Sequence, residues 1–155
     1  MIEIHAMSPN DAPLCATLMS TSEPWTLIGR TYDESIALVT DPSKEAWVAH
    51  DGDRFLGFIL LVLRGAFVGY IQIIAVSAEA RGTGVGSKLI EFAERRIFSQ
   101  FPNVFLCVSS FNPRARALYE RLGYQLVGEL KDYLVRGASE FLMRKTTGPL
   151  RSSTD

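Results

Sequence analysis

Residues Tyr70–Phe98 read YIQIIAVSAEARGTGVGSKLIEFAERRIF, and the rest of the chain is organised around this stretch. It begins as an apolar strand, breaks at a small polar turn and passes through Arg81–Gly86 (RGTGVG) into an amphipathic helix. Glycines at alternate positions let the backbone approach a ligand without clashes from Cβ atoms. Free N–H groups at the start of the helix favour a negatively charged ligand. The stretch therefore predicts a phosphate cradle.

Two common phosphate-binding motifs do not fit this loop. The Walker motif places a glycine directly before its lysine, whereas Lys88 follows Ser87. The dinucleotide fingerprint GxGxxG needs a glycine at the position of Ser87. Both failures count against a nucleotide-binding domain. A glycine-rich turn that binds no ligand is the structural alternative.

Composition indicates one globular domain in a chain of 155 residues, of which 47% are hydrophobic and 21% charged. A net charge of −1 gives no general attraction to nucleic acid or to an anionic membrane. The longest apolar run, Phe55–Leu63, is too short to span a bilayer. The N-terminus lacks the features of a signal peptide. We therefore expect a cytoplasmic protein that binds neither nucleic acid nor membrane.

Cysteine and histidine are too scattered to predict a metal site. Cys15 and Cys107 are expected to be reduced thiols in the cytoplasm. His5 and His50 show no metal-ligand spacing, so we expect no metal and assign both to structural or solvated positions.

Turn signals and hydrophobic periodicity predict the order β-α-α-β-β-β-α-β-α-β-β, which is typical of an α/β (α+β) domain with a mixed sheet and helices on both faces. Helices are expected from Ser8, where Asp11 has capping-box spacing, from Thr31, from the glycine loop and from Asn112. The expected strands are Ile2–Ala6, Glu45–Ala49, Phe55–Leu63, Tyr70–Val76, Val104–Val108, Tyr124–Leu130 and Glu140–Arg144. The domain is expected over residues 1–145, followed by a disordered polar tail, residues 146–155.

A second motif, NPRARALYERLGY at Asn112–Tyr124, places Asn112, Ala115 and Tyr119 on one helical face. Together with Arg-Gly-x-Gly-x-Gly after a strand ending Ile-Ala-Val, it resembles the GCN5-related N-acetyltransferase (GNAT) superfamily. The resemblance covers roughly Ile2–Lys145. It implies a mostly antiparallel sheet of about seven strands, in which the fourth and fifth strands splay apart to form an acetyl-CoA slot.

The resemblance implies an N-acetyltransferase in which an amine attacks the thioester directly, with acetyl-CoA as co-substrate. The backbone of Ile74, Ala75 and Val76 is expected to pair with the pantetheine arm, aided by a nearby bulge. The Val76 N–H would stabilise the oxyanion. The pyrophosphate is expected to bind Arg81, Gly82, Thr83, Gly84, Val85, Gly86 and Ser87. The alternative role for Arg81 is a solvated surface arginine.

The second motif is expected to complete the cofactor site. Asn112 either hydrogen-bonds the pantetheine arm or caps the helix, and both are compatible. Ala115 lies on the same face. Tyr119 is the candidate general acid for the CoA thiolate, because a tyrosine pKa of about 10 keeps its hydroxyl protonated at neutral pH. The alternative is a core-packing tyrosine.

The general base is not identified by the sequence. Acetyltransferases of the RimI type often carry a glutamate where this chain has Cys107, for which core packing is the favoured interpretation. The candidates are Glu79, Glu140, Glu23, Gln72 as a water holder, or a water relay. The predicted acceptor site comprises Glu23, Trp25, Gln72, Tyr133 and Glu140, with Arg136 on the rim beside Tyr133.

Two questions stay open at this point. A non-catalytic acyl-CoA-binding or sensor domain would retain the same cradle. Within the enzyme interpretation, the acceptor is either a small-molecule amine or a protein N-terminus or lysine. A homodimer is possible by analogy alone.

Overall fold

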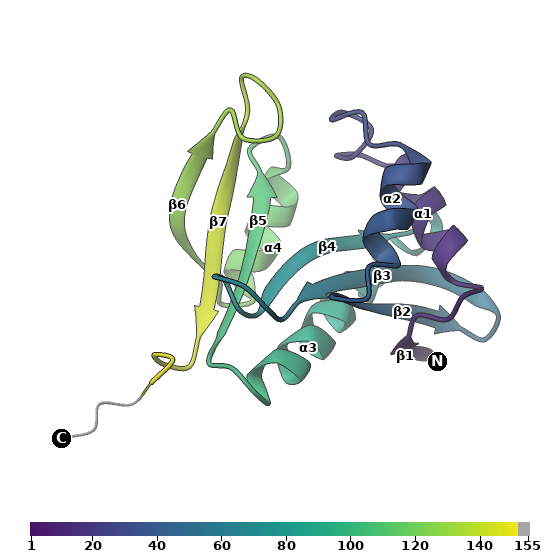
Figure 1. The fold of residues 1–155 in the computed structure, drawn as a ribbon, viewed down its shortest axis with the longest axis horizontal. Helices are drawn as coiled ribbons and strands as arrows, with labels where there is room; N and C mark the ends of the chain where they lie inside the picture. Colours follow the sequence, from purple (N-terminus) through teal and green to yellow (C-terminus); the bar gives the residue numbers. More distant parts are fainter. Residues whose placement is uncertain (152–155) are drawn as a thin grey trace.

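The computed structural model describes residues 1–151, which form one seven-stranded sheet in the order β1-β2-β3-β4-β5-β7-β6 (Figure 1). Neighbouring strands are antiparallel except β4 and β5, which are parallel. This confirms the mixed, mostly antiparallel sheet. The strands are β1 Ile2–Ala6, β2 Glu45–Asp51, β3 Arg54–Val62, β4 Tyr70–Val76, β5 Asn103–Ser109, β6 Gln125–Lys131 and β7 Ser139–Thr146.

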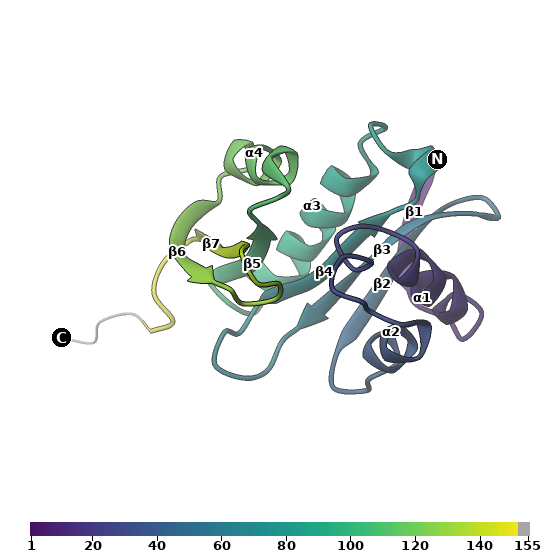
Figure 2. The ribbon, with the colours of Figure 1, turned by 90° about the horizontal axis from the view of Figure 1, so that it is seen from above.

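The helices cover both faces of the sheet, as expected. Helices α1 and α2 lie together on one face, while α3 and α4 lie on the other (Figure 2). A short 3-10 turn, η1, connects β4 to the glycine loop. The bounds are α1 Ala12–Ser20, α2 Tyr32–Val39, η1 Ala78–Ala80, α3 Val85–Phe98 and α4 Pro113–Arg121.

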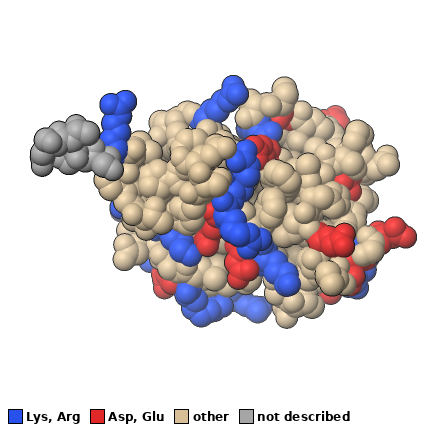
Figure 3. Space-filling view, turned by 90° about the horizontal axis from the view of Figure 1, so that it is seen from below, with Lys and Arg blue, Asp and Glu red and all other residues tan. Residues whose placement is uncertain are grey.

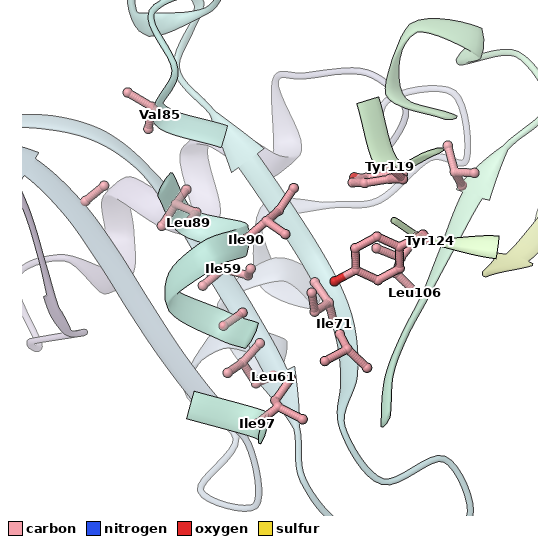
Figure 4. Packing of buried hydrophobic residues seen from close by; sticks show 14 of the residues in the cluster. Ile59, Leu61, Ile71, Val85, Leu89, Ile90, Ile97, Leu106, Tyr119 and Tyr124 are labelled. Atoms are coloured by element: carbon pink, nitrogen blue, oxygen red, sulfur yellow. The ribbon is translucent and has the colours of Figure 1, made fainter. Parts of the chain in front are cut away.

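Strand β3 lies in the interior of the sheet, between β2 and β4, and both of its faces are apolar. Phe58 and Leu60 pack into the cluster under α1 and α2, whereas Ile59 and Leu61 pack into the cluster under α3. This follows from the alternation of side chains along a strand. Figure 4 shows the α3 side of this core, where Leu89, Ile90 and Ile97 meet Ile59, Leu61 and Ile71.

Charged side chains occupy the outer side of α3. Lys88, Glu91 and Arg95 are exposed, and Figure 3 shows a central band of lysine and arginine flanked by acidic residues on the face seen from below. Arg96 anchors this helix to the sheet, because its guanidinium donates to both carboxylate oxygens of Glu45, at 3.0 and 2.6 Å. The amphipathic helix predicted after the glycine loop is therefore present.

Two of the predicted helix starts have different outcomes. The capping box before α2 is confirmed: the Glu34 N–H donates to Thr31 Oγ1 at 3.1 Å, and the Thr31 N–H donates to Glu34 Oε2 at 3.4 Å. The start at Ser8 is wrong, because α1 begins at Ala12. Asp11 Oδ2 accepts from the backbone and hydroxyl of Ser8 at 2.8 and 2.7 Å, which forms a separate turn before the helix.

The end of β7 extends into the predicted tail. Thr146 pairs with Asn103, and the Thr147 N–H donates to the Pro102 carbonyl at 2.8 Å. Backbone bonds therefore hold the first two residues of that tail, while residues 152–155 lie outside the described part of the chain. Of the helices in residues 1–151, none is long and apolar enough to cross a membrane.

Candidate active site

Strands β4 and β5 separate soon after they meet. They pair only at Tyr70 with Phe105 and at Ile71 with Leu106. A cleft of about 1210 Å³ opens beyond this point and is lined by both strands, which confirms the predicted slot. The bulge that accompanies it lies at Gln72, because Ile71 and Ile73 pair with consecutive residues of β3. We expected this bulge nearer Ile74–Val76, and it lies earlier because the strands already part after Ile71.

The cleft brings together most of the predicted site residues. From the cofactor set it is lined by Ile74, Ala75, Val76, Arg81, Asn112, Ala115 and Tyr119. From the acceptor set it is lined by Glu23, Trp25, Gln72, Tyr133 and Glu140. Glu79 is exposed and lies outside the cleft lining, so the structure gives no support to it as a base.

The glycine loop lies beyond the cleft lining, with only Arg81 reaching into it. Gly82 and Gly84 have φ values of 77° and 88°, the left-handed region that favours glycine. A Cβ atom built on either glycine would meet nothing within 4 Å. The loop therefore presents an open backbone surface. The other residues predicted to bind the pyrophosphate lie outside the cleft lining: Gly82, Thr83, Gly84, Val85, Gly86 and Ser87.

The N-terminus of α3 supplies the free donors expected of an anion cradle. Gly84 is its N-cap, and the Lys88 N–H is bonded to the Gly84 carbonyl at 3.1 Å. The N–H groups of Val85, Gly86 and Ser87 precede that first helical bond, so they have no carbonyl within the helix. Arg81 is exposed, and its Nε donates to the Val76 carbonyl over 3.4 Å.

Asn112 caps α4. Its Oδ1 accepts from the Ala115 N–H at 3.2 Å, so the capping role is confirmed. The side chain also lines the cleft, so capping leaves its amide NH₂ available for a second partner.

Tyr119 combines core packing with a position in the cleft. It is 7% exposed, and its ring meets that of Tyr124 edge to face with the centroids 6.0 Å apart. Figure 4 shows the ring extending from α4 toward β4. Burial raises the pKa of Tyr119 to about 12, so its hydroxyl stays protonated throughout the neutral range.

Glu140 is the buried acidic residue among those predicted for the acceptor site. It is 6% exposed on β7 and pairs with Ser109 of β5. Burial raises the pKa of Glu140, and a hydrogen bond with Ser109 offsets only part of that rise. A carboxylate with a raised pKa is closer to the proton affinity that a general base needs at neutral pH.

Cys107 lines the cleft and is half-buried, which corrects the expectation of a core-packing cysteine. At Cys107 the strand β5 is no longer paired with β4, although it stays paired with β7, so this residue lies beside the open slot. Burial raises the pKa of the Cys107 thiol, so the thiol is neutral and a poor base.

Tyr70 is a cleft residue that sequence reasoning missed. Burial raises its pKa, as do Cys107, Tyr133 and Glu140 nearby. The burial pattern along β4 indicates it, since Tyr70, Gln72, Ile74 and Val76 are all half-buried and all line the cleft. Other lining residues come from loops that carry no such signal: Arg30, Arg64, Phe67 and Phe111.

Gln72 carries an unusual side-chain oxygen. Its Oε1 is buried and has no hydrogen-bond partner among the described residues. An unpaired buried acceptor costs about 1–3 kcal/mol. Since Gln72 lines the cleft, this oxygen is available to a bound molecule that donates a hydrogen bond.

Comparison with known proteins gives consistent matches. The model of the Acetyltransferase (GNAT) family matches residues 13–124. Blasticidin-S acetyltransferase of Streptomyces morookaense is 33% identical over 90 residues, which cover 54% of this chain and 66% of that protein, slightly less than two thirds. N-alpha-acetyltransferase RimI of Mycobacterium tuberculosis is 28% identical over 155 residues, which cover 95% of this chain and 94% of that protein.

Solved structures show the same fold. A putative GNAT-family acetyltransferase from Desulfovibrio desulfuricans superposes with a TM-score of 0.83 at 19% identity, covering 96% of this chain and 100% of the other. An aminoglycoside 6'-N-acetyltransferase complexed with coenzyme A superposes with a TM-score of 0.77 at 19% identity, covering 97% and 99%.

Proposed function

This chain belongs to the acetyltransferase (GNAT) family, and on that premise we propose that it transfers an acetyl group from acetyl-CoA to a primary amine. One observation carries the proposal. A single cleft between β4 and β5 holds a protonated tyrosine, Tyr119, and a buried carboxyl group, Glu140, and the anion cradle of α3 lies at its donor end.

The donor end suits acetyl-CoA. The pantetheine arm would lie along Ile74–Val76, where β4 has lost its β5 partner, and the pyrophosphate would bind the N–H groups from Gly82 to Ser87. The Ser77 N–H donates to the Leu56 carbonyl of β3 at 2.8 Å. Because backbone groups alternate in direction along a strand, the Val76 N–H faces the opposite side, toward the cleft. It would there stabilise the thioester oxyanion.

The residues divide the chemistry between them. The amine nitrogen attacks the carbonyl carbon after losing a proton to Glu140, directly or through one water. The carbon–sulfur bond then breaks, and the Tyr119 hydroxyl gives its proton to the departing CoA thiolate. The products are the N-acetylated amine and CoA.

The acceptor end favours a cationic amine beside an aromatic group. Glu23 and Glu140 supply negative charge, while Trp25, Tyr70 and Tyr133 supply aromatic walls. One matched relative is named a blasticidin-S acetyltransferase and another an N-alpha-acetyltransferase. The experiment below therefore includes both small amines and peptides with a free N-terminus as acceptors.

Release of the CoA thiol across a panel of amines and N-terminal peptides tests the proposal. We expect release that needs both acetyl-CoA and a particular amine. A non-catalytic sensor would instead be stabilised thermally by acetyl-CoA or CoA and would release no thiol with any amine. Stabilisation by ATP but by neither CoA species would overturn the proposal.

A further inference from the structure

Three side chains that can bind a metal ion meet at the N-terminal edge of the sheet, away from the cleft. They are His5 of β1, Asp11 in the turn before α1, and His50 of β2. One ligand atom from each lies within 4.8 Å of the other two. None of the three lines the cleft, so the cluster has no role in the proposed acetyl transfer.

The sheet register explains why these residues meet. His5 pairs with Val48 across β1 and β2, and His50 follows two residues later, so both rings project from the same face. The rings stack with their centroids 5.0 Å apart. Val48 belongs to the core cluster under α1, which places both histidines on the face that α1 covers. The turn before α1 then brings Asp11 over them.

The spacing of the nearest pair is close to that of two ligands on one metal. His50 Nε2 and Asp11 Oδ1 are 2.9 Å apart. Two ligand atoms at ordinary zinc distances are about 3.0 to 3.4 Å apart in tetrahedral or octahedral geometry. The pair therefore needs to open by only a few tenths of an ångström. His5 is exposed, and its Nδ1 lies 3.0 Å from the carbonyl oxygen of its neighbour Ala6, which leaves its Nε2 without a hydrogen bond within residues 1–151.

Hydrogen bonds from Ser8 fix the orientation of the Asp11 carboxylate. The Ser8 N–H and hydroxyl both bond Asp11 Oδ2, which leaves Oδ1 directed at His50. Such outer contacts typically orient metal ligands and fix their charge state.

We propose that His5, Asp11 and His50 bind a divalent transition-metal ion of the zinc class, with solvent completing its coordination. Two imidazoles and one carboxylate suit zinc and its neighbours rather than magnesium or calcium. The ion would join β1, the turn before α1 and the end of β2, so its role is structural.

Zinc titration of the untagged, chelator-treated full chain tests the site. We expect one equivalent to bind and the Tm to rise by about 5 to 10 °C at hundredfold saturation, with no comparable shift from Mg²⁺. Cobalt should give visible d–d absorption without a thiolate charge-transfer band, because the ligands include no cysteine. If zinc did not raise the Tm, the three residues would form only a hydrogen-bonded contact between the sheet and the turn before α1, and the proposal would be overturned.

Substitution identifies the ligands. His5→Gln should fold normally, because His5 is exposed, and should weaken zinc binding by about tenfold or more. His50→Gln should likewise weaken zinc binding by about tenfold or more. The control is Asp53→Asn, which removes an exposed carboxylate from the nearby turn and should leave zinc binding unchanged. Zinc affinity unaffected by His5→Gln, or a cobalt–thiolate band, would assign the ion to another site. Thiol release by the proposed transfer reaction should be the same in all four proteins.

Discussion

Tyr119 and Tyr124 touch edge to face, yet their hydroxyl groups have different surroundings. The Tyr124 hydroxyl donates to Glu94 Oε2 at 2.9 Å, beneath α3. The Tyr119 hydroxyl has no hydrogen-bond partner within residues 1–151, and Tyr119 lines the cleft. Of the two adjacent tyrosine hydroxyls, one is therefore hydrogen-bonded beneath α3, while the other belongs to the cleft and is the proposed acid.

Replacing Tyr119 by phenylalanine should therefore lower kcat by about 10²-fold or more and leave the Tm unchanged, since the ring stays packed and no protein hydrogen bond is lost. Tyr124→Phe is the matched control. It should cost about 1.5–3 kcal/mol of unfolding free energy, because it removes a bond to a charged group, and it should preserve kcat. Steady-state thiol release and thermal melts measure both. Full turnover by Tyr119→Phe would remove its role as the acid.

Glu140→Gln should lower kcat/KM by about 10²-fold at neutral pH. It should also abolish the fall of kcat/KM on the acidic side of the pH–rate profile. In the native protein the rate should fall as pH falls through the raised pKa of Glu140, because its carboxylate is the base in the proposed mechanism. Tyr119 contributes no limb in this range, since its pKa is about 12. A pH–rate profile of both proteins checks this, and an equal rate loss at every pH would contradict the assignment.

The same substitution should raise stability. A raised folded-state pKa means that Glu140 favours folding at low pH, below its unfolded value, and that this contribution is lost as pH rises through the folded pKa. At neutral pH the buried charge is therefore unfavourable, and Glu140→Gln should melt higher than the native protein. The difference should vanish at low pH, where both side chains are neutral. Thermal melts across pH measure it.

The fold was largely predictable because its signals are local. Alternating side chains identify the strands, and Thr31 with Glu34 marks a helix start within four residues. Ser8 and Asp11 have the same spacing but form a separate turn, in which the Ser8 hydroxyl donates to the Asp11 carboxylate, and that carboxylate also bonds His50, 39 residues away. A local pattern cannot show such a distant partner.

The donor half of the site was predictable for the same reason, since the glycine loop and the Asn112–Tyr119 helix are continuous motifs. The acceptor half assembles from separate segments. Phe67 and Arg30 reach the cleft from loops, and nothing in their neighbouring residues indicates it. The meeting of His5 with His50 depends on the pairing of β1 with β2, which sequence spacing does not reveal.

Two glycines of the loop should respond differently to alanine. Gly84→Ala places a side chain at φ 88° and should lower the Tm by about 2 to 8 °C. Gly86→Ala lies within α3, where its Cβ would be 3.8 Å from Val76 Cγ2, so the Tm should hold or rise. Its methyl group would nevertheless add bulk to the loop that we propose for the pyrophosphate, so KM for acetyl-CoA should rise. An unchanged KM for Gly86→Ala would place the pyrophosphate elsewhere.

Gln72→Met should raise KM for the amine by about tenfold while leaving KM for acetyl-CoA unchanged. The buried Oε1 of Gln72 lacks a partner within residues 1–151, so we expect the bound amine, or a water that it holds, to donate to it. Removing that acceptor costs the complex a hydrogen bond of about 0.5–1.5 kcal/mol and leaves the donor unpaired, whereas the free protein loses no internal bond. The Tm should therefore not fall. Gln125→Met, on the exposed face of β6, is the control and should change neither KM. Separate saturation curves for each substrate give both constants, and a rise confined to acetyl-CoA would move Gln72 to the donor side of the cleft.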